Sequence, residues 1–137
     1  MSEAYLVKGD PTLIIKDIVN EAKPVYDSWS DSVDEGRNSY SYVYKDNPKS
    51  SVPARCSVMF NSTAYFYYHY SGKKWNVTSP QAGSTVYLTP GSTVTLENDR
   101  SPTILGMENS GRLYVRCGVS DSGGSDLYFN FALTWEY

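Results

Sequence analysis

The side chains that most often carry catalysis are scarce in this chain. It has a single histidine, His69, which stands in a row of tyrosines. No segment matches the motif of a serine hydrolase, a zinc protease or a phosphate-binding loop. Acid–base catalysis needs titratable groups whose pKa values suit the reaction, and a lone histidine limits the choice. We predict that the protein is not an enzyme, although two carboxylates could still meet in space, as they do in glycosidases.

Two acidic segments carry the oxygen ligands that calcium prefers. The stretch 27–37 has four carboxylates, and "SDSGGSD" at 120–126 has two. Neither has the spacing of an EF-hand, so both are typical of solvated loops, and 27–37 is expected to be a surface loop that carries Trp29. Cys56 and Cys117 alternate with apolar neighbours, which favours buried free thiols over a zinc site or a disulfide. We predict no metal site and no cofactor.

The densest group of aromatic residues lies in "AYFYYHYSGKKWNVT" at 64–78. In a strand, Tyr65, Tyr67 and His69 point to one face and the residues between them to the other. Both faces are therefore aromatic, and only one of them can cover the core. The chain also has 13 tyrosines against 4 phenylalanines. Tyrosine suits surfaces that become half buried against a partner, so we predict a partner surface.

Candidates for that surface are aromatic and basic side chains expected on outward strand faces. About half of the tyrosines should instead complete the core with their hydroxyl groups at its rim. The remainder, with their neighbours, would form a binding or interface surface. The candidate residues are Tyr40, Tyr42, Tyr44, Tyr65, Tyr67, His69, Trp75, Arg112, Tyr114 and Arg116.

Length and charge narrow the class of protein. The 137 residues suit one domain, 1–137, and a net charge of −3 argues against a nucleic-acid partner. The first residues, "MSEAYLVKGDPTLIIKD", lack the features of a secretory signal, and no apolar stretch reaches the roughly 20 residues that span a bilayer. We expect a protein made in the cytoplasm, without a membrane span and with unmodified sequons at Asn61 and Asn76.

After residue 38, apolar and polar residues alternate with a period of two, which is typical of strands. Strands are predicted at 39–46 and 55–61, and hairpins at 65–78, 84–98 and 102–119. The last of these hairpins should bury Leu113, Val115, Cys117 and Val119. The strand 127–137 is the clearest, and its predicted buried face consists of Leu127, Phe129, Phe131, Leu133 and Trp135.

Some eight short strands separated by turn residues predict an all-β fold. The expected architecture is an antiparallel β-sandwich of jelly-roll or immunoglobulin-like type, and a barrel fits less well. The segment 11–22 fits a short N-terminal helix and a first strand equally well.

Two functions from different classes fit these observations. The first is a non-catalytic structural protein, a capsid, decoration or tail component of a virion, that assembles with itself or other structural subunits through aromatic contacts. The alternative is a lectin-like module that binds a glycan. In that case Trp75, Tyr67 or Tyr114 would stack on the sugar, and its hydroxyl groups would bond to Asn61, Asp121 or Asn130.

Overall fold

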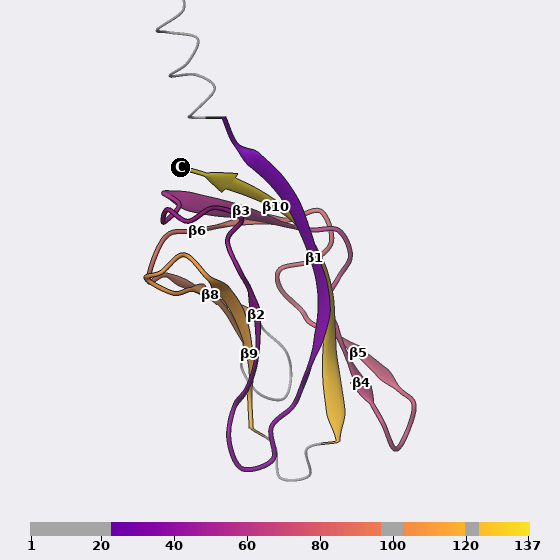
Figure 1. Cartoon of the computed structure of the whole chain (residues 1–137). Coiled ribbons are helices and arrows are strands. Elements are labelled where there is room, and N and C mark those ends of the chain that lie inside the picture. Colours follow the sequence, from indigo (N-terminus) through magenta and orange to yellow (C-terminus); the bar gives the residue numbers. More distant parts are fainter. Residues whose placement is uncertain (1–22, 97–102, 120–123) are drawn as a thin grey trace, which may run out of the picture.

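The computed structural model describes residues 23–96, 103–119 and 124–137. All the regular secondary structure within these ranges consists of β-strands. The strands form two antiparallel sheets (Figure 1). One hydrophobic core of buried side chains lies between them. An all-β, sandwich-like fold is thus confirmed. The segment 11–22 lies outside the described residues. Within the described ranges, no helix is long and apolar enough to cross a membrane.

The first sheet is organised around its longest strand, β10. One edge of β10 pairs with β1 over all ten residues of β1, and the other edge pairs with β3 and β4, one after the other. β6 extends the sheet from β3, and β5 extends it from β4. The six strands are β1 (Val25–Asp34), β3 (Arg55–Phe60), β4 (Tyr65–Tyr68), β5 (Lys74–Asn76), β6 (Thr85–Leu88) and β10 (Ser125–Glu136).

The second sheet has the order β2-β9-β8-β7, and all its pairings are antiparallel. Its inner face closes the core from the other side, while the outer face of β2 and β9 carries tyrosine and arginine. The strands are β2 (Ser41–Lys45), β7 (Thr93–Leu96), β8 (Thr103–Met107) and β9 (Leu113–Cys117).

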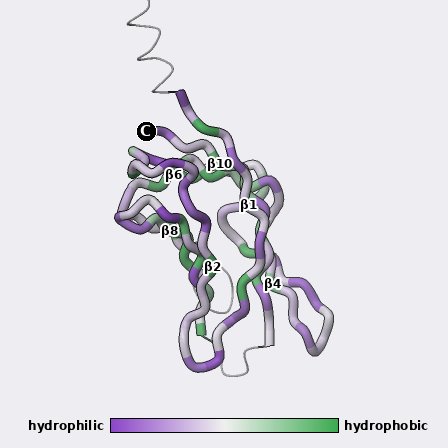
Figure 2. The backbone as a smooth tube through the Cα atoms, viewed as in Figure 1, coloured by the Kyte–Doolittle hydropathy of each residue, from purple (hydrophilic) through white to green (hydrophobic). Residues whose placement is uncertain are grey.

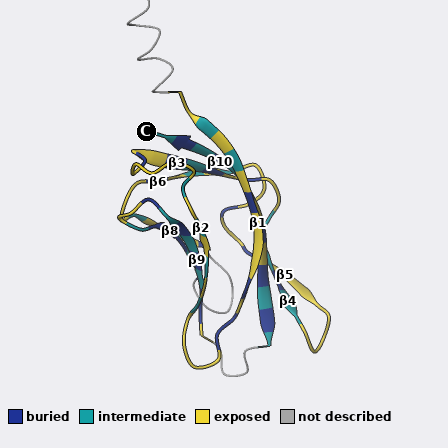
Figure 3. Cartoon of the chain, viewed as in Figure 1, coloured by how far each residue is buried: buried dark blue, intermediate teal, exposed yellow. Residues whose placement is uncertain are grey.

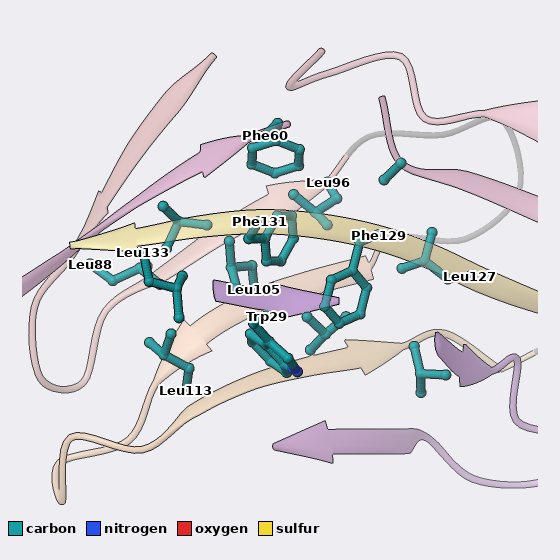
Figure 4. Close-up of a cluster of buried hydrophobic side chains, with 14 of the residues drawn as sticks. Trp29, Phe60, Leu88, Leu96, Leu105, Leu113, Leu127, Phe129, Phe131 and Leu133 are labelled. Atoms are coloured by element: carbon teal, nitrogen blue, oxygen red, sulfur yellow. The ribbon is translucent and has the colours of Figure 1, made fainter. Parts of the chain in front are cut away.

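The core is rich in rings that come from β1, β3 and β10. Phe131 packs edge-on against Phe60 at 4.7 Å between centroids and stacks on Phe129 at 4.6 Å. Figure 4 shows these rings among leucines of both sheets, such as Leu105 and Leu133. The alternation along β10 is visible in the burial colours of Figure 3. The predicted buried face is confirmed for all five residues: Leu127, Phe129, Phe131, Leu133 and Trp135.

The prediction of a surface loop at 27–37 is wrong, because most of this stretch belongs to β1. Trp29 and Val33 are buried, and Trp29 packs edge-on against Phe129 at 4.9 Å. Serines alternate with these residues on the outward side, and much of β1 therefore has the polar colouring of a loop in Figure 2. Pairing with β10 satisfies the backbone groups along one edge of β1, so a polar composition is compatible with a strand that buries only every fourth residue.

Two further predictions need correction. The stretch 84–98 is not a hairpin, because β6 pairs with β3 in the first sheet and β7 pairs with β8 in the second. The turn at Pro90 and Gly91 thus carries the chain from one sheet to the other. Val119 is exposed and lies beyond the end of β9. The hairpins β4–β5 and β8–β9 are confirmed, as are the buried free thiols of Cys56 and Cys117.

Candidate functional site

Six predicted site residues lie on the outer face of the second sheet. Alternation along β2 and β9 turns Val43 and Val115 toward the core, so the residues on either side of each valine point outward. The register then places Tyr44 opposite Tyr114 and Tyr42 opposite Arg116. We call this set the tyrosine–arginine face: Tyr40, Tyr42, Tyr44, Arg112, Tyr114 and Arg116.

The rings of the tyrosine–arginine face pack on one another and remain open to solvent. Tyr42 and Tyr44 are stacked, with centroids 5.9 Å apart and planes 3° from parallel. Tyr114 meets Tyr42 edge-on at 6.1 Å. Tyr40, Tyr42 and Tyr44 nevertheless keep 50%, 47% and 43% of their surface exposed. These contacts hold the rings in place without covering them.

Both arginines of the face lie over tyrosine rings. The guanidinium of Arg112 is 3.8 Å from the centroid of Tyr44, and that of Arg116 is 4.3 Å from Tyr40. Arg112 also donates hydrogen bonds of 2.8 and 3.1 Å to the two carboxylate oxygens of Glu108. These bonds lower the pKa of the Glu108 carboxyl and raise that of the guanidinium. The Nε of Arg116 is buried and has no hydrogen-bond partner among the described residues.

Gly106, which sequence reasoning missed, shapes the centre of this face. It pairs with Tyr114 across β8 and β9, and a Cβ at Gly106 would lie 2.5 Å from Cζ and Oη of Tyr114. The phenol ring therefore lies over the glycine backbone and covers β8. A glycine inside the apolar strand "TILGM" is the kind of sequence feature that marks such a close approach.

A polar hollow of about 610 Å³ borders one end of the face. Its wall includes Arg112 and Glu108, and the loop after β2 supplies the rest of the charged lining. Asn47 fixes that loop by accepting a 3.0 Å hydrogen bond from the backbone amide of Lys49 and donating one to the carbonyl of Ser51. The tyrosine–arginine face thus continues into a concave rim that carries both signs of charge.

The other four predicted residues lie on the β4–β5 hairpin and its turn, and they do not form one surface. Tyr65 and Tyr67 share the outer face of the first sheet, whereas Trp75 pairs with Phe66 and so lies on the opposite side. Tyr65 stacks on Tyr128 at 5.4 Å, with planes 15° apart. Successive side chains of a strand point to opposite faces, so the aromatic residues of 64–78 divide between the two faces of the first sheet.

His69 belongs to a charged cluster with two carboxylates. Its Nε2 lies 2.6 Å from Oδ2 of Asp126, and Asp126 pairs with Asp34 across β10 and β1. A hydrogen bond with Asp126, together with burial, raises the pKa of Asp34. Burial opposes ionisation of Asp126, but hydrogen bonds with Asp34 and His69 lower its pKa overall. The cluster joins β1 and β10 to the turn after β4, and its two carboxylates come from segments that the sequence suggested as loops.

Among the residues proposed to bond a sugar, two come together. Asn61 donates a 3.1 Å hydrogen bond from Nδ2 to Oδ1 of Asn130 on the outer face of the first sheet. Trp75 and Tyr114 lie elsewhere, so neither can stack on a sugar held by this pair. Asp121 lies outside the described residues.

Comparison of the chain with protein-family models, curated proteins and solved structures gives no match. Within the described ranges, no group of three or more His, Cys, Asp or Glu side chains is arranged to hold a metal ion. The geometry of the described residues is therefore the basis for the functional proposals that follow.

Proposed function

We propose that the protein is a non-catalytic structural subunit that assembles with copies of itself through the tyrosine–arginine face. The observation that carries this proposal is the gathering of four tyrosines and two arginines on one exposed sheet face. Tyrosine and arginine are enriched in protein interfaces and among the residues that dominate binding energy. A broad, flat array of this kind suits another protein surface better than a small ligand.

The packing of the face supports association because its side chains are already ordered. Stacked rings and cation–π contacts fix Tyr42, Tyr44 and Arg112 before any partner arrives. Binding then costs less side-chain entropy than it would for mobile residues. Arg112 is already paired with Glu108, and the guanidinium of Arg116 is held over the ring of Tyr40.

The second arginine of the face predicts one feature of the partner surface. Arg116 is partly buried beside Tyr40, and its guanidinium carries a positive charge at the face. We therefore expect the opposing surface to place a carboxylate or a backbone carbonyl at the guanidinium of Arg116. The chain has 15 acidic residues against 12 basic ones, so a second copy can supply a carboxylate.

The setting that we propose is a virion, in which the subunit would be a capsid, decoration or tail component made in the cytoplasm. β-Sandwich proteins of jelly-roll type form many virus shells, and this part of the proposal rests on that analogy. The assignment of the sandwich to the jelly-roll or immunoglobulin-like type is likewise a proposal. Other structural subunits are the alternative partners, and nucleic acid is not proposed as one.

The test is the oligomeric state of a variant with Tyr42→Ser and Tyr44→Ser. Interface anchors typically cost about 2 kcal/mol or more each when truncated, so the dissociation constant should rise at least about tenfold. Light scattering and native mass spectrometry over a range of concentrations would measure it. The melting temperature should change little, because strands tolerate serine on a solvent face.

A matched control carries Tyr26→Ser and Tyr70→Ser, which remove two tyrosines that are 78% and 90% exposed and lie outside the face. Assembly of this control should equal that of the wild type. A wild-type protein that stays monomeric, or equal assembly of both variants, would contradict the proposal. Lost stability with unchanged assembly would show instead that the face is part of the core.

A further inference from the structure

A second concave feature lies on the outer face of the first sheet, away from the tyrosine–arginine face. It opens where β10 passes from pairing with β3 to pairing with β4, and its volume is about 250 Å³. Pockets for drug-sized ligands measure roughly 300–1,000 Å³, so this groove suits one small ring. Three strands and the loop after β3 line it, through Ser30, Ser62, Tyr65, Tyr128, Phe129 and Asn130.

One wall of the groove is an ordered pair of phenol rings. Tyr65 and Tyr128 stack 5.4 Å apart, and Nζ of Lys74 lies 4.8 Å from the centroid of Tyr65. Tyr65 is thus held by a contact with Lys74 as well as by Tyr128, and Tyr128 keeps 36% of its surface exposed. An aromatic surface with a polar hydroxyl at its edge matches a ring that has both C–H groups and hydroxyl groups.

Neutral polar groups complete the groove. Oδ1 of Asn130 accepts the hydrogen bond from Asn61, so its NH₂ group is the donor that remains for a ligand. Ser30 pairs with Asn130 across β1 and β10, and its hydroxyl group can both donate and accept. Ser62 adds a second hydroxyl group from the loop. None of the described residues that line the groove carries a charge.

We infer that this groove binds a neutral pyranose ring, either free or as part of a longer glycan. A pyranose has an apolar face for the tyrosine wall and adjacent hydroxyl groups for the amide and the two serines. The lack of charged lining disfavours phosphate and sialic acid, and the small volume disfavours a peptide segment. The inference is independent of the assembly proposal, because it uses the opposite sheet and none of the same residues.

The test is a titration of the ¹⁵N-labelled protein with the methyl glycosides of glucose, galactose, mannose and N-acetylglucosamine, followed by NMR, together with a glycan array. We expect at least one glycoside to shift the Asn130 side-chain amide and neighbouring backbone signals saturably. Asn130→Asp should weaken binding at least tenfold, since the carboxylate still accepts from Asn61 but lacks the NH₂ donor. Tyr128→Ala should have a similar effect through loss of the wall.

Tyr87→Ala is the matched control, because Tyr87 is 57% exposed on the same sheet but does not line the groove. It should bind the glycoside as the wild type does. Asn130→Asp and Tyr128→Ala alter different chemistry, so a folding defect in one, visible by circular dichroism, leaves the other as the test. The inference is overturned if no glycoside or array glycan binds, if shifts map to the tyrosine–arginine face, or if the folded variants bind normally. A failure of this kind would leave assembly through Tyr42 and Tyr44 untouched.

Discussion

β10 and β2 each carry a pair of stacked aromatic rings two residues apart, but the two pairs meet different surroundings. On the inner side of β10, Phe129 and Phe131 stack at 4.6 Å and are buried against Trp29. On the outer side of β2, Tyr42 and Tyr44 stack at 5.9 Å, and almost half of each residue stays exposed. The spacing is the same, so the pattern of aromatics does not by itself decide whether a row of rings is core or surface.

The chemistry of the rings and of their neighbours separates the two rows. Four of the five residues of the inner row are phenylalanine or leucine, which bring no polar atom into the dry layer between the sheets. The fifth, Trp135, donates a 3.2 Å hydrogen bond from its indole N–H to Asp27. The outer row uses tyrosine, and Arg112 and Arg116 lie over its rings. Substitutions in the inner row should therefore change folding, and substitutions in the outer row should change association.

The largest expected effect is on the inner row. Phe131→Ala should lower the free energy of unfolding by about 3–5 kcal/mol, the usual cost of emptying an aromatic core position. Phe131 is fully buried and touches Phe60 and Phe129, so collapse around the cavity would be incomplete. Urea unfolding would measure the change, with Ser28→Ala on the outward side of β1 expected to stay within about 0.5 kcal/mol. A similar cost for both variants would remove the contrast between the two sides of the sheet.

The buried thiols report the tightness of the same core. Burial raises the pKa of both Cys56 and Cys117 to about 12, so thiolate is scarce at neutral pH. A thiol reagent should label the native protein at least about a hundredfold more slowly than the protein in denaturant, because reaction requires opening of the core. Absorbance of the chromophore that the reagent releases would measure the rate of labelling. Rapid labelling of the native protein would mean that one of these strands opens easily.

Much of the fold follows from period-two alternation, which locates β2, β3, β4, β9 and β10. Strand partners do not follow from it. β6 and β7 look like a hairpin around Pro90 and Gly91, yet they belong to different sheets, because β6 pairs with the earlier strand β3 and β7 pairs with the next strand, β8. β1 was missed because Trp29 and Val33 are its only buried residues. Apart from Tyr26, the outer side of β1 consists of serine and aspartate, which gives this strand the composition of a loop.

The candidate site shows the same limit. Alternation predicts that Tyr42, Tyr44 and Tyr114 point outward, but only the pairing of β2 with β9 brings them together. The alternation within each strand also does not show that Trp75 and Tyr65 lie on opposite faces of the β4–β5 hairpin, because this depends on the register between the two strands. The contact between Asn61 and Asn130 joins residues 69 positions apart, and no local feature of the sequence indicates it.

A smaller effect is expected at Gly106, over which the ring of Tyr114 lies. Gly106→Ala places a Cβ against Cζ and Oη of Tyr114, so the ring must swing away from β8. The free energy of unfolding should change by less than about 1 kcal/mol. Alanine lowers the conformational entropy of the unfolded chain, and the ring of Tyr114 can move into solvent. Association should weaken about tenfold, because the flat face loses its centre. Light scattering of the variant would measure its association, and thermal unfolding would measure its stability. Unchanged assembly would place Tyr114 outside the interface.

The smallest effect concerns the ion pair at the rim of the outer row. Hydrogen bonds from Arg112 lower the pKa of Glu108 in the folded protein, so the pair stabilises the fold at neutral pH and loses this contribution as the pH falls through the folded pKa. Both side chains are about one-third exposed, at 39% and 35%, so water and salt screen the pair. Carbon-detected NMR should show Glu108 titrating below the ordinary range of glutamate, and Arg112→Gln should raise its pKa toward that range. The same variant frees the ring of Tyr44 from its cation, whereas Arg112→Lys keeps a positive charge there. If Glu108 titrates at the same pH in all three proteins, the guanidinium is not held by the carboxylate, and the order of the outer row comes from the stacked rings alone.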